Sequence, residues 1–150
     1  QAGLTDKIIL NKAIDNFNNT NLSFDIKDFD LNFAKGLSLE DGLSTLADFT
    51  ASIIYNSIIE EFRFIKGSDL KILVCGGGRK NLSLVSKIKK KLPNNILLNL
   101  IDNYKIDGDF VESQAFAYLA IRSYLKKPIS YPETTGCNEA STGGVVVKNY

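Results

Sequence analysis

The chain has 150 residues, with 18 basic and 17 acidic side chains and no methionine, tryptophan or histidine. Without histidine there is no Ser-His-Asp or Cys-His nucleophile, no histidine general base and no histidine-ligated zinc, so chemistry must use carboxylates, Lys or Arg, hydroxyls, backbone amides or a cofactor. The near-neutral charge argues against a nucleic-acid-binding protein, and the short apolar runs give no indication of a membrane segment. The length fits one domain, and the lack of methionine indicates a segment of a longer polypeptide.

Helical spacing of apolar residues dominates the first part of the chain. It predicts a helix over 4–17, followed by an irregular linker or short strands over 18–37. Ser38, with Glu40 and Asp41 after it, has the pattern of a helix start with acidic residues at the positive end. This helix is expected to run to about Phe62, with an apolar stripe made by Leu43, Leu46, Ala47, Thr50, Ile53, Ile54 and Ile58.

The middle of the chain has the order strand, glycine turn, helix, strand. Strands are predicted over 69–75 and 95–101, and a helix between them is stopped by Pro93. A helix between two strands predicts a parallel pair and an α/β layer. A polar turn is expected over 102–109. A helix over 110–125 should bury Phe116, Leu119 and Ala120, and a loop-rich tail could form a short strand at 145–147.

The two cysteines give no metal site. Cys75 and Cys137 lie far apart without a CxxC spacing, and with no histidine they cannot complete a zinc site. The alternative is a disulfide between them, but we expect them to be reduced, buried thiols of a cytosolic protein.

Three consecutive glycines, Gly76, Gly77 and Gly78, follow the first strand and precede a helix that begins after Asn81. This arrangement places bare backbone N–H groups at the positive end of a helix, which suits a phosphate or a nucleotide lying close to the backbone. It is neither a P-loop nor a GxGxxG motif. The alternative is a tight turn that needs positive φ, but three glycines exceed what such a turn requires, so the pattern favours ligand contact.

A group of carboxylates follows the second strand: Asp102, Asp107, Asp109 and Glu112. Such a group could hold a metal or supply a base, although the EF-hand spacing is not met. Asp109 and Glu112 also stand three residues apart at a helix start, which is the spacing of a capping box. On this local pattern alone, capping is the favoured interpretation of Glu112.

A basic run could face an anionic partner or form a solvated helix face, and the near-neutral total charge favours the solvated face. Its members are Arg79, Lys80, Lys87, Lys89, Lys90 and Lys91.

Taken together, these motifs resemble the anhydro-N-acetylmuramic acid kinase family. Residues 74–81 resemble its strand-GGG-x-x-Asn segment, and residues 102–120 resemble its D-x4-DGD-x2-EAQAFAxLA pattern. The upstream helix at 37–51 and the tail at 128–144 also match, so the likeness runs in order from about Leu22 to the end.

The resemblance implies an α/β fold, namely an actin-like (ribonuclease H-like) ATPase lobe with a mixed sheet and packed helices. It implies an ATP- and Mg²⁺-dependent enzyme of the bacterial cytoplasm that phosphorylates 1,6-anhydro-N-acetylmuramic acid. Water opens the anhydro ring to give N-acetylmuramic acid 6-phosphate during cell-wall recycling. By resemblance, Gly76, Gly77, Gly78 and Asn81 line the nucleotide, and Glu112 associates with the sugar and the catalytic water. No metal ligand is assigned to this segment, and a homodimer is expected.

The chain departs from the family pattern at two places. Lys105-Ile106 stands where the family has Gly-Trp, which leaves the sugar preference open, and Ser113 replaces an alanine. The family's amino-terminal GTS-x-DG motif and its catalytic Asp segment are not in this chain. We therefore expect residues 1–150 to form the carboxyl-terminal lobe of a two-lobed kinase, inactive by itself. The alternatives are a lobe of another actin-like sugar kinase and a non-catalytic module that binds nucleotide or a partner protein.

Overall fold

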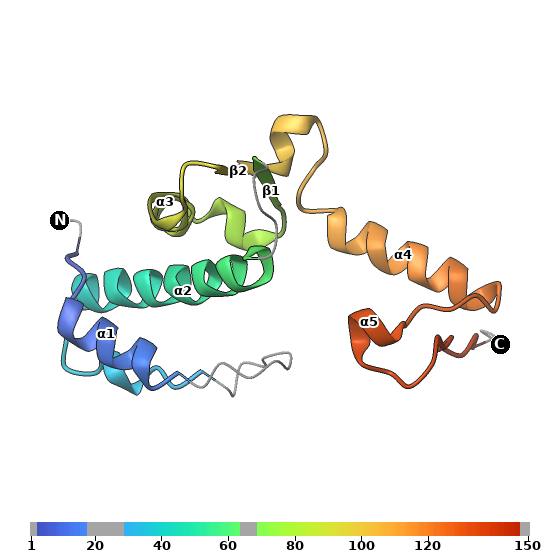
Figure 1. Ribbon diagram of the computed structural model, residues 1–150, viewed down its shortest axis with the longest axis horizontal. Coiled ribbons are helices and arrows are strands. Elements are labelled where there is room, and N and C mark those ends of the chain that lie inside the picture. The colour runs from blue at the N-terminus through green and yellow to red at the C-terminus, as the bar shows by residue number, and fades with distance from the viewer. Residues whose placement is uncertain (1–2, 18–28, 64–68, 148–150) are drawn as a thin grey trace. The chain divides into compact units, whose positions relative to one another are not determined.

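The computed structural model describes residues 3–17, 29–63 and 69–147, and the chain separates into two compact units, 1–99 and 100–150 (Figure 1). The amino-terminal unit contains α1 (Lys7–Asp15), the 3-10 turn η2 (Asn32–Ala34), α2 (Leu39–Phe62), β1 (Leu70–Val74), the 3-10 turn η3 (Gly77–Lys80), α3 (Leu82–Lys91) and β2 (Ile96–Leu100), which ends at the boundary. The carboxyl-terminal unit contains the 3-10 turn η4 (Ile101–Tyr104), α4 (Val111–Tyr124) and α5 (Pro132–Thr135).

The first two helices begin at side-chain caps. The Asp6 carboxylate accepts hydrogen bonds from the N–H groups of Ile8 and Ile9, so α1 starts later than the apolar spacing predicted. The Ser38 hydroxyl accepts the Asp41 N–H at 3.1 Å, which confirms the predicted start of α2. The Asp41 carboxylate in turn accepts the Leu4 N–H at 2.7 Å and ties the start of the chain to this helix end.

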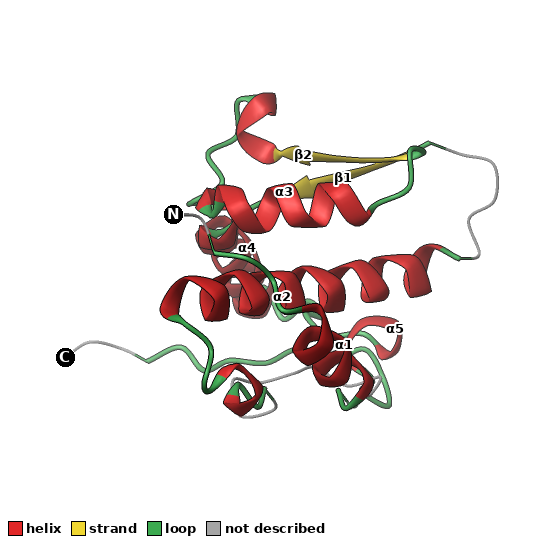
Figure 2. Cartoon of the chain, turned by 90° about the vertical axis from the view of Figure 1, so that its left-hand side faces the viewer, coloured by secondary structure: helices red, strands yellow, loops and turns green. Residues whose placement is uncertain are grey.

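Helix α2 lies between α1 and α3, as Figures 1 and 2 both show, and its buried face differs from the predicted apolar stripe. Thr45 and Ser52 are buried, whereas Leu43 is 59% exposed. The two hydroxyls donate to the carbonyls of Asp41 and Asp48, one turn earlier in the helix, which satisfies them inside the helix packing. Hydropathy alone places Thr and Ser on the solvent side of a helix, so the apolar stripe predicted for α2 is not the face that is buried.

The core between α1 and α2 is aromatic. Phe49 is 4% exposed and packs with Leu10 and Ala13, while the partly buried rings of Phe17 and Phe33 lie against it. The ring centroids of Phe17 and Phe33 are 5.7 and 5.0 Å from that of Phe49. These contacts fix α1 on one side of α2 and leave the other side of α2 to α3.

Strands β1 and β2 form a two-stranded sheet, run in the same direction and are joined through α3 (Figure 2). Ile96 and Leu98 of β2 are buried, whereas Leu97 between them is 53% exposed, as expected for a strand with one covered face. The predicted strand–helix–strand order is confirmed. The described fold is α/β, with helices and a small parallel sheet.

The carboxyl-terminal unit confirms the predicted helix but not its predicted core. No residue of α4 is buried, and Phe116 is 65% exposed, because the short elements of this unit do not cover the helix. Val145–Val147 forms no strand; the tail instead makes an antiparallel bridge between Ser130 and Ser141.

Two other expectations concern thiols and membranes. Cys75 and Cys137 are free, as expected, but Cys75 is exposed and Cys137 half-buried, so the prediction of buried thiols is wrong. In the parts of the chain that the structure describes, no helix combines the length and apolar character needed to cross a bilayer.

Candidate functional site

The glycine turn joins β1 to α3. Gly76 has φ 75°, in the region that favours glycine, whereas Gly77 and Gly78 do not have positive φ. A Cβ placed on Gly77 or Gly78 would meet nothing within 4 Å, and both residues are exposed. Of the three glycines in this turn, the fold therefore requires only Gly76. The other two positions leave an open stretch of backbone at the surface.

Arg79 closes this turn from inside. Its side chain is 5% exposed, and its Nη1 donates to the Gly76 carbonyl at 3.0 Å. The Arg79 N–H also points to this carbonyl, at 3.3 Å. The prediction that Arg79 belongs to a solvated basic face is wrong, because its guanidinium is used to hold the backbone of the turn.

Asn81 starts α3. Its side-chain oxygen accepts the Leu84 N–H at 3.0 Å, which makes it the N-cap of the helix. The capping bond uses the amide oxygen, so the NH₂ group is what the exposed Asn81 can offer to a ligand. The helix cap and the three glycines thus form one continuous feature.

The carboxylates of the carboxyl-terminal unit shape a second turn. Asp107 accepts the Asp109 N–H at 2.9 Å, and Asp102 faces the Gly108 N–H at 3.5 Å. Among the described residues, no group of three or more His, Cys, Asp or Glu side chains is placed to hold a metal ion. These aspartates therefore organise the turn that leads into α4.

Glu112 is the second residue of α4 and is exposed. The residue that caps the start of the helix is Phe110, which makes no side-chain capping bond, so the predicted capping box between Asp109 and Glu112 is wrong. Within residues 3–17, 29–63 and 69–147, the Glu112 carboxylate has no hydrogen bond or ion pair. Glu112 belongs to the second unit and the glycine turn to the first, and each is formed within its own unit.

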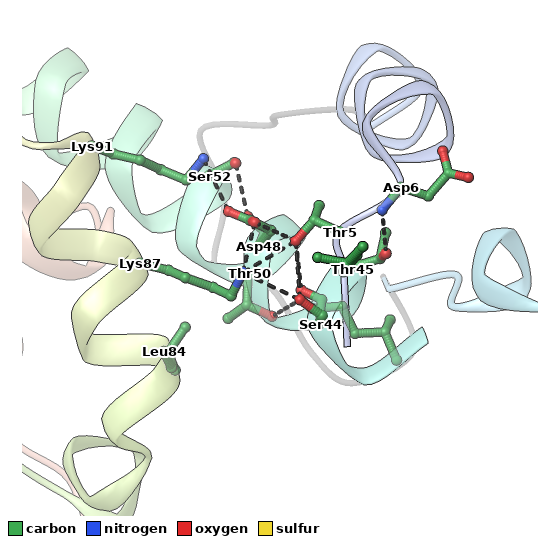
Figure 3. A network of polar contacts seen from close by, with 12 residues as sticks. Thr5, Asp6, Ser44, Thr45, Asp48, Thr50, Ser52, Leu84, Lys87 and Lys91 are labelled. Carbon is green, nitrogen blue, oxygen red and sulfur yellow. Dashed lines mark hydrogen bonds and ion pairs between the residues drawn. The ribbon is translucent and has the colours of Figure 1, made fainter. Parts of the chain in front are cut away.

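A network of polar contacts centred on Asp48 was missed by the sequence reasoning (Figure 3). The Asp48 carboxylate pairs with Nζ of Lys87 at 2.8 Å and with Nζ of Lys91 at 3.2 Å, and it accepts the Thr5 hydroxyl at 2.7 Å. Lys87 also donates to the hydroxyls of Thr5 and Ser44, at 3.2 and 3.4 Å. One signal could have revealed the network, namely a lone Asp in the apolar part of α2 together with two lysines one helical turn apart.

The lysines and hydrogen bonds around Asp48 favour its ionised carboxylate. Partial burial by itself raises the pKa of the Asp48 carboxyl, but the hydrogen bonds from Lys87, Thr5 and Lys91 and the Lys87 charge outweigh it. They lower the pKa from 3.8 to about 2. The solvated-face prediction is therefore wrong for Lys87 and Lys91 as well as for Arg79, whereas Lys89 and Lys90 are exposed.

Arg122 holds the tail against α4. Its guanidinium donates to the Pro128 carbonyl at 2.7 Å and to the Tyr131 hydroxyl at 2.7 Å, and it lies 5.7 Å from the centroid of the Tyr118 ring. The hydrogen bond with Tyr118 raises the pKa of Arg122, so the side chain remains charged. Its contacts are explained by the folding of this unit.

Comparison with known proteins places the chain among related sequences. A family model described as anhydro-N-acetylmuramic acid kinase matches residues 13–149. The anhydro-N-acetylmuramic acid kinase of Pelagibacter ubique (strain HTCC1062) is 64% identical over 152 aligned positions, which cover 99% of this chain and 40% of that protein. The proteins of the same name from Zymomonas mobilis and Rhizorhabdus wittichii are 38% and 36% identical, covering 81% and 95% of this chain.

The chain spans 40%, 32% and 38% of the lengths of these three relatives. The family match includes both the glycine turn and the Glu112 segment, and it extends over far more than half of the chain. The chain therefore belongs to the anhydro-N-acetylmuramic acid kinase family.

Proposed function

We propose that the full-length protein containing this chain transfers the γ-phosphoryl group of ATP to 1,6-anhydro-N-acetylmuramic acid. Water opens the anhydro ring in the same reaction, so that the products are ADP and N-acetylmuramic acid 6-phosphate, in cell-wall recycling in the cytoplasm. The family match over residues 13–149 carries this proposal. The chain would form the carboxyl-terminal lobe of an actin-like kinase, contribute one side of the site and be inactive alone.

The glycine turn fits a nucleotide. Gly77 and Gly78 are exposed, and an added Cβ would meet nothing, so a ligand can approach the backbone there closely. The turn leads directly into α3, whose amino-terminal end carries partial positive charge that suits phosphate oxygens. We assign Gly76, Gly77, Gly78 and the Asn81 NH₂ group to nucleotide binding.

The described residues do not form a cage for Mg²⁺, since they hold no group of three metal-binding side chains. Mg²⁺ is commonly bound by one or two carboxylates together with phosphate oxygens and water. It would therefore enter with ATP and neutralise charge on the transferred phosphoryl group, and we assign no residue of this chain to it.

We assign Glu112 to the sugar side of the reaction. An exposed carboxylate at the start of a helix can accept a hydrogen bond from a sugar hydroxyl or from the water that attacks the anhydro bridge. Since the water must lose a proton as it adds, a carboxylate beside it can take that proton. The remaining task of the protein is to hold water, sugar and phosphoryl group in line.

The test is the reaction itself. The full-length protein is incubated with ATP, Mg²⁺ and the anhydro sugar, and the sugar product is analysed by mass spectrometry. We expect a product that has gained both a phosphoryl group and one water, with ADP formed in equal amount. A sugar that remains unchanged while ADP forms, or no ATP consumption at all, would refute the proposal.

A second candidate is a kinase of the same kind that acts on a different sugar, and the Lys105-Ile106 departure favours it. Lys105 adopts a left-handed conformation, with φ 61°, at the end of η4 in the turn before α4. The chain therefore carries a lysine side chain at a position where the family pattern has glycine. Parallel assays with N-acetylmuramic acid and N-acetylglucosamine distinguish this candidate, because it predicts faster phosphorylation of one of them.

A further inference from the structure

The position of α3 matters for the proposed nucleotide site because the glycine turn is its direct extension. Asn81 caps this ten-residue helix, and η3 precedes the cap without an intervening loop. Any shift of α3 along its axis therefore carries Asn81 and the glycines with it.

Two kinds of contact hold α3 in place. Val85 and Ile88 are 7% and 4% exposed and supply apolar packing, which resists separation but is weakly directional. Lys87 and Lys91 reach the opposite helix α2 and pair with the two oxygens of Asp48, at 2.8 and 3.2 Å (Figure 3). These short ion pairs depend on distance and direction, so they set where α3 lies along α2.

The network is also braced by the segment that precedes α1. The Thr5 hydroxyl donates to Asp48 at 2.7 Å and receives a hydrogen bond from Lys87 at 3.2 Å. The side chains of Lys87, Lys91 and Asp48 are 20%, 28% and 17% exposed, so water screens the pairs less than it would at the open surface. One carboxylate therefore orders two lysines of α3.

We propose that Asp48 is a positioning residue for the nucleotide-binding turn: by holding Lys87 and Lys91, it fixes α3 and thereby Asn81 and the glycines at its start. Lys87 lies six residues after Asn81, about 9 Å along a helix. Asp48 does not touch the nucleotide and acts only through α3. This inference rests on the proposed function, because it assigns Asp48 to the ATP side of that site.

The test compares kinetic constants of the full-length protein with and without the ion pairs. Asp48→Asn keeps the shape of the side chain and removes its charge, and Lys91→Met removes only the longer pair if the first variant folds poorly. We expect either variant to raise the KM for ATP roughly 2- to 30-fold while the KM for the sugar stays unchanged. Lys90→Met is the matched control on the exposed side of the same helix and should leave both constants unchanged.

A loss of stability alone must be separated from mispositioning. Phe49→Leu weakens the core between α1 and α2 but leaves the contacts between Asp48 and α3 in place. It therefore supplies a destabilised protein for comparison, and all variants are assayed at a temperature where they are folded. The inference is overturned if Asp48→Asn leaves the KM for ATP unchanged, or if Phe49→Leu raises it as much. A wild-type protein that shows no ATP dependence overturns the proposed function, and the assignment of Asp48 with it.

Discussion

Asp48→Asn tests the energetics of the network directly, because the side chain keeps its size and loses only its charge. In the native protein the hydrogen bonds from Lys87, Thr5 and Lys91 keep the Asp48 pKa at about 2, against 3.8 for an unperturbed carboxyl. A depressed native pKa means that the ionised carboxylate stabilises the folded state. That contribution is fully present above the unfolded pKa and is lost as the pH falls from about 4 towards 2.

The magnitude follows from the size of the shift. Each pKa unit corresponds to about 1.4 kcal/mol, so the shift from 3.8 to about 2 gives a contribution of about 2 kcal/mol to the free energy of unfolding. The Asp48 side chain is 17% exposed, so solvent screening weakens this contribution but does not remove it. At pH 7 we expect Asp48→Asn to lower the free energy of unfolding by about 2 kcal/mol.

The assay is urea unfolding followed by circular dichroism at several pH values between 7 and 2. Wild type should lose about 2 kcal/mol more than Asp48→Asn as the pH falls from 5 to 2, because only wild type has this carboxylate to protonate. Asp15→Asn, at an exposed position near the end of α1, is the control and should follow wild type. Parallel pH profiles for wild type and Asp48→Asn would refute the reasoning.

Three further substitutions test other features. Lys105→Gly should raise the free energy of unfolding by about 1 kcal/mol, because Lys105 has φ 61°, a conformation that glycine adopts without strain. Lys127→Gly is the control: φ is not positive at that position, so this substitution should not raise the free energy of unfolding. Gly3→Ala should lower the free energy of unfolding by about 1–3 kcal/mol, since the added Cβ would lie 1.9 Å from the Glu40 carbonyl oxygen. Urea unfolding measures the free energy of unfolding of each of these variants. Glu112→Gln should lower kcat of the full-length protein about 100-fold or more with an unchanged melting temperature, and an unchanged kcat would contradict its assignment.

The helices and the sheet order were predictable because each carries a local signal. Ser38 marks the start of α2, and the glycine run and Pro93 bracket α3, so these boundaries depend on neighbouring residues only. The buried face of α2 was not predictable, because Thr45 and Ser52 are buried after satisfying their hydroxyls within the helix. A hydropathy scale does not take account of a hydrogen bond from a hydroxyl to the helix backbone.

The candidate site divides in the same way. The glycine turn could be found from the sequence, since three glycines in a row between a strand and a helix are a local pattern, and the structure shows that only Gly76 needs positive φ. The Asp48 network could not be found from the sequence. Asp48 and Lys87 lie far apart in the chain and come into contact only when α2 packs against α3. Arg79 looked like one more surface cation, and only the folded turn shows its guanidinium on the Gly76 carbonyl.

The most direct test of the nucleotide site is the KM for ATP of full-length Gly77→Val. An added Cβ at Gly77 meets nothing within 4 Å and φ is not positive there, so the variant should fold as wild type does. If the nucleotide lies against this backbone, the valine side chain occupies its place. We then expect the KM for ATP to rise at least about tenfold, a loss of about 1.4 kcal/mol of binding, while the KM for the sugar stays the same. An unchanged KM for ATP would show that the glycines serve only the turn and would contradict the account.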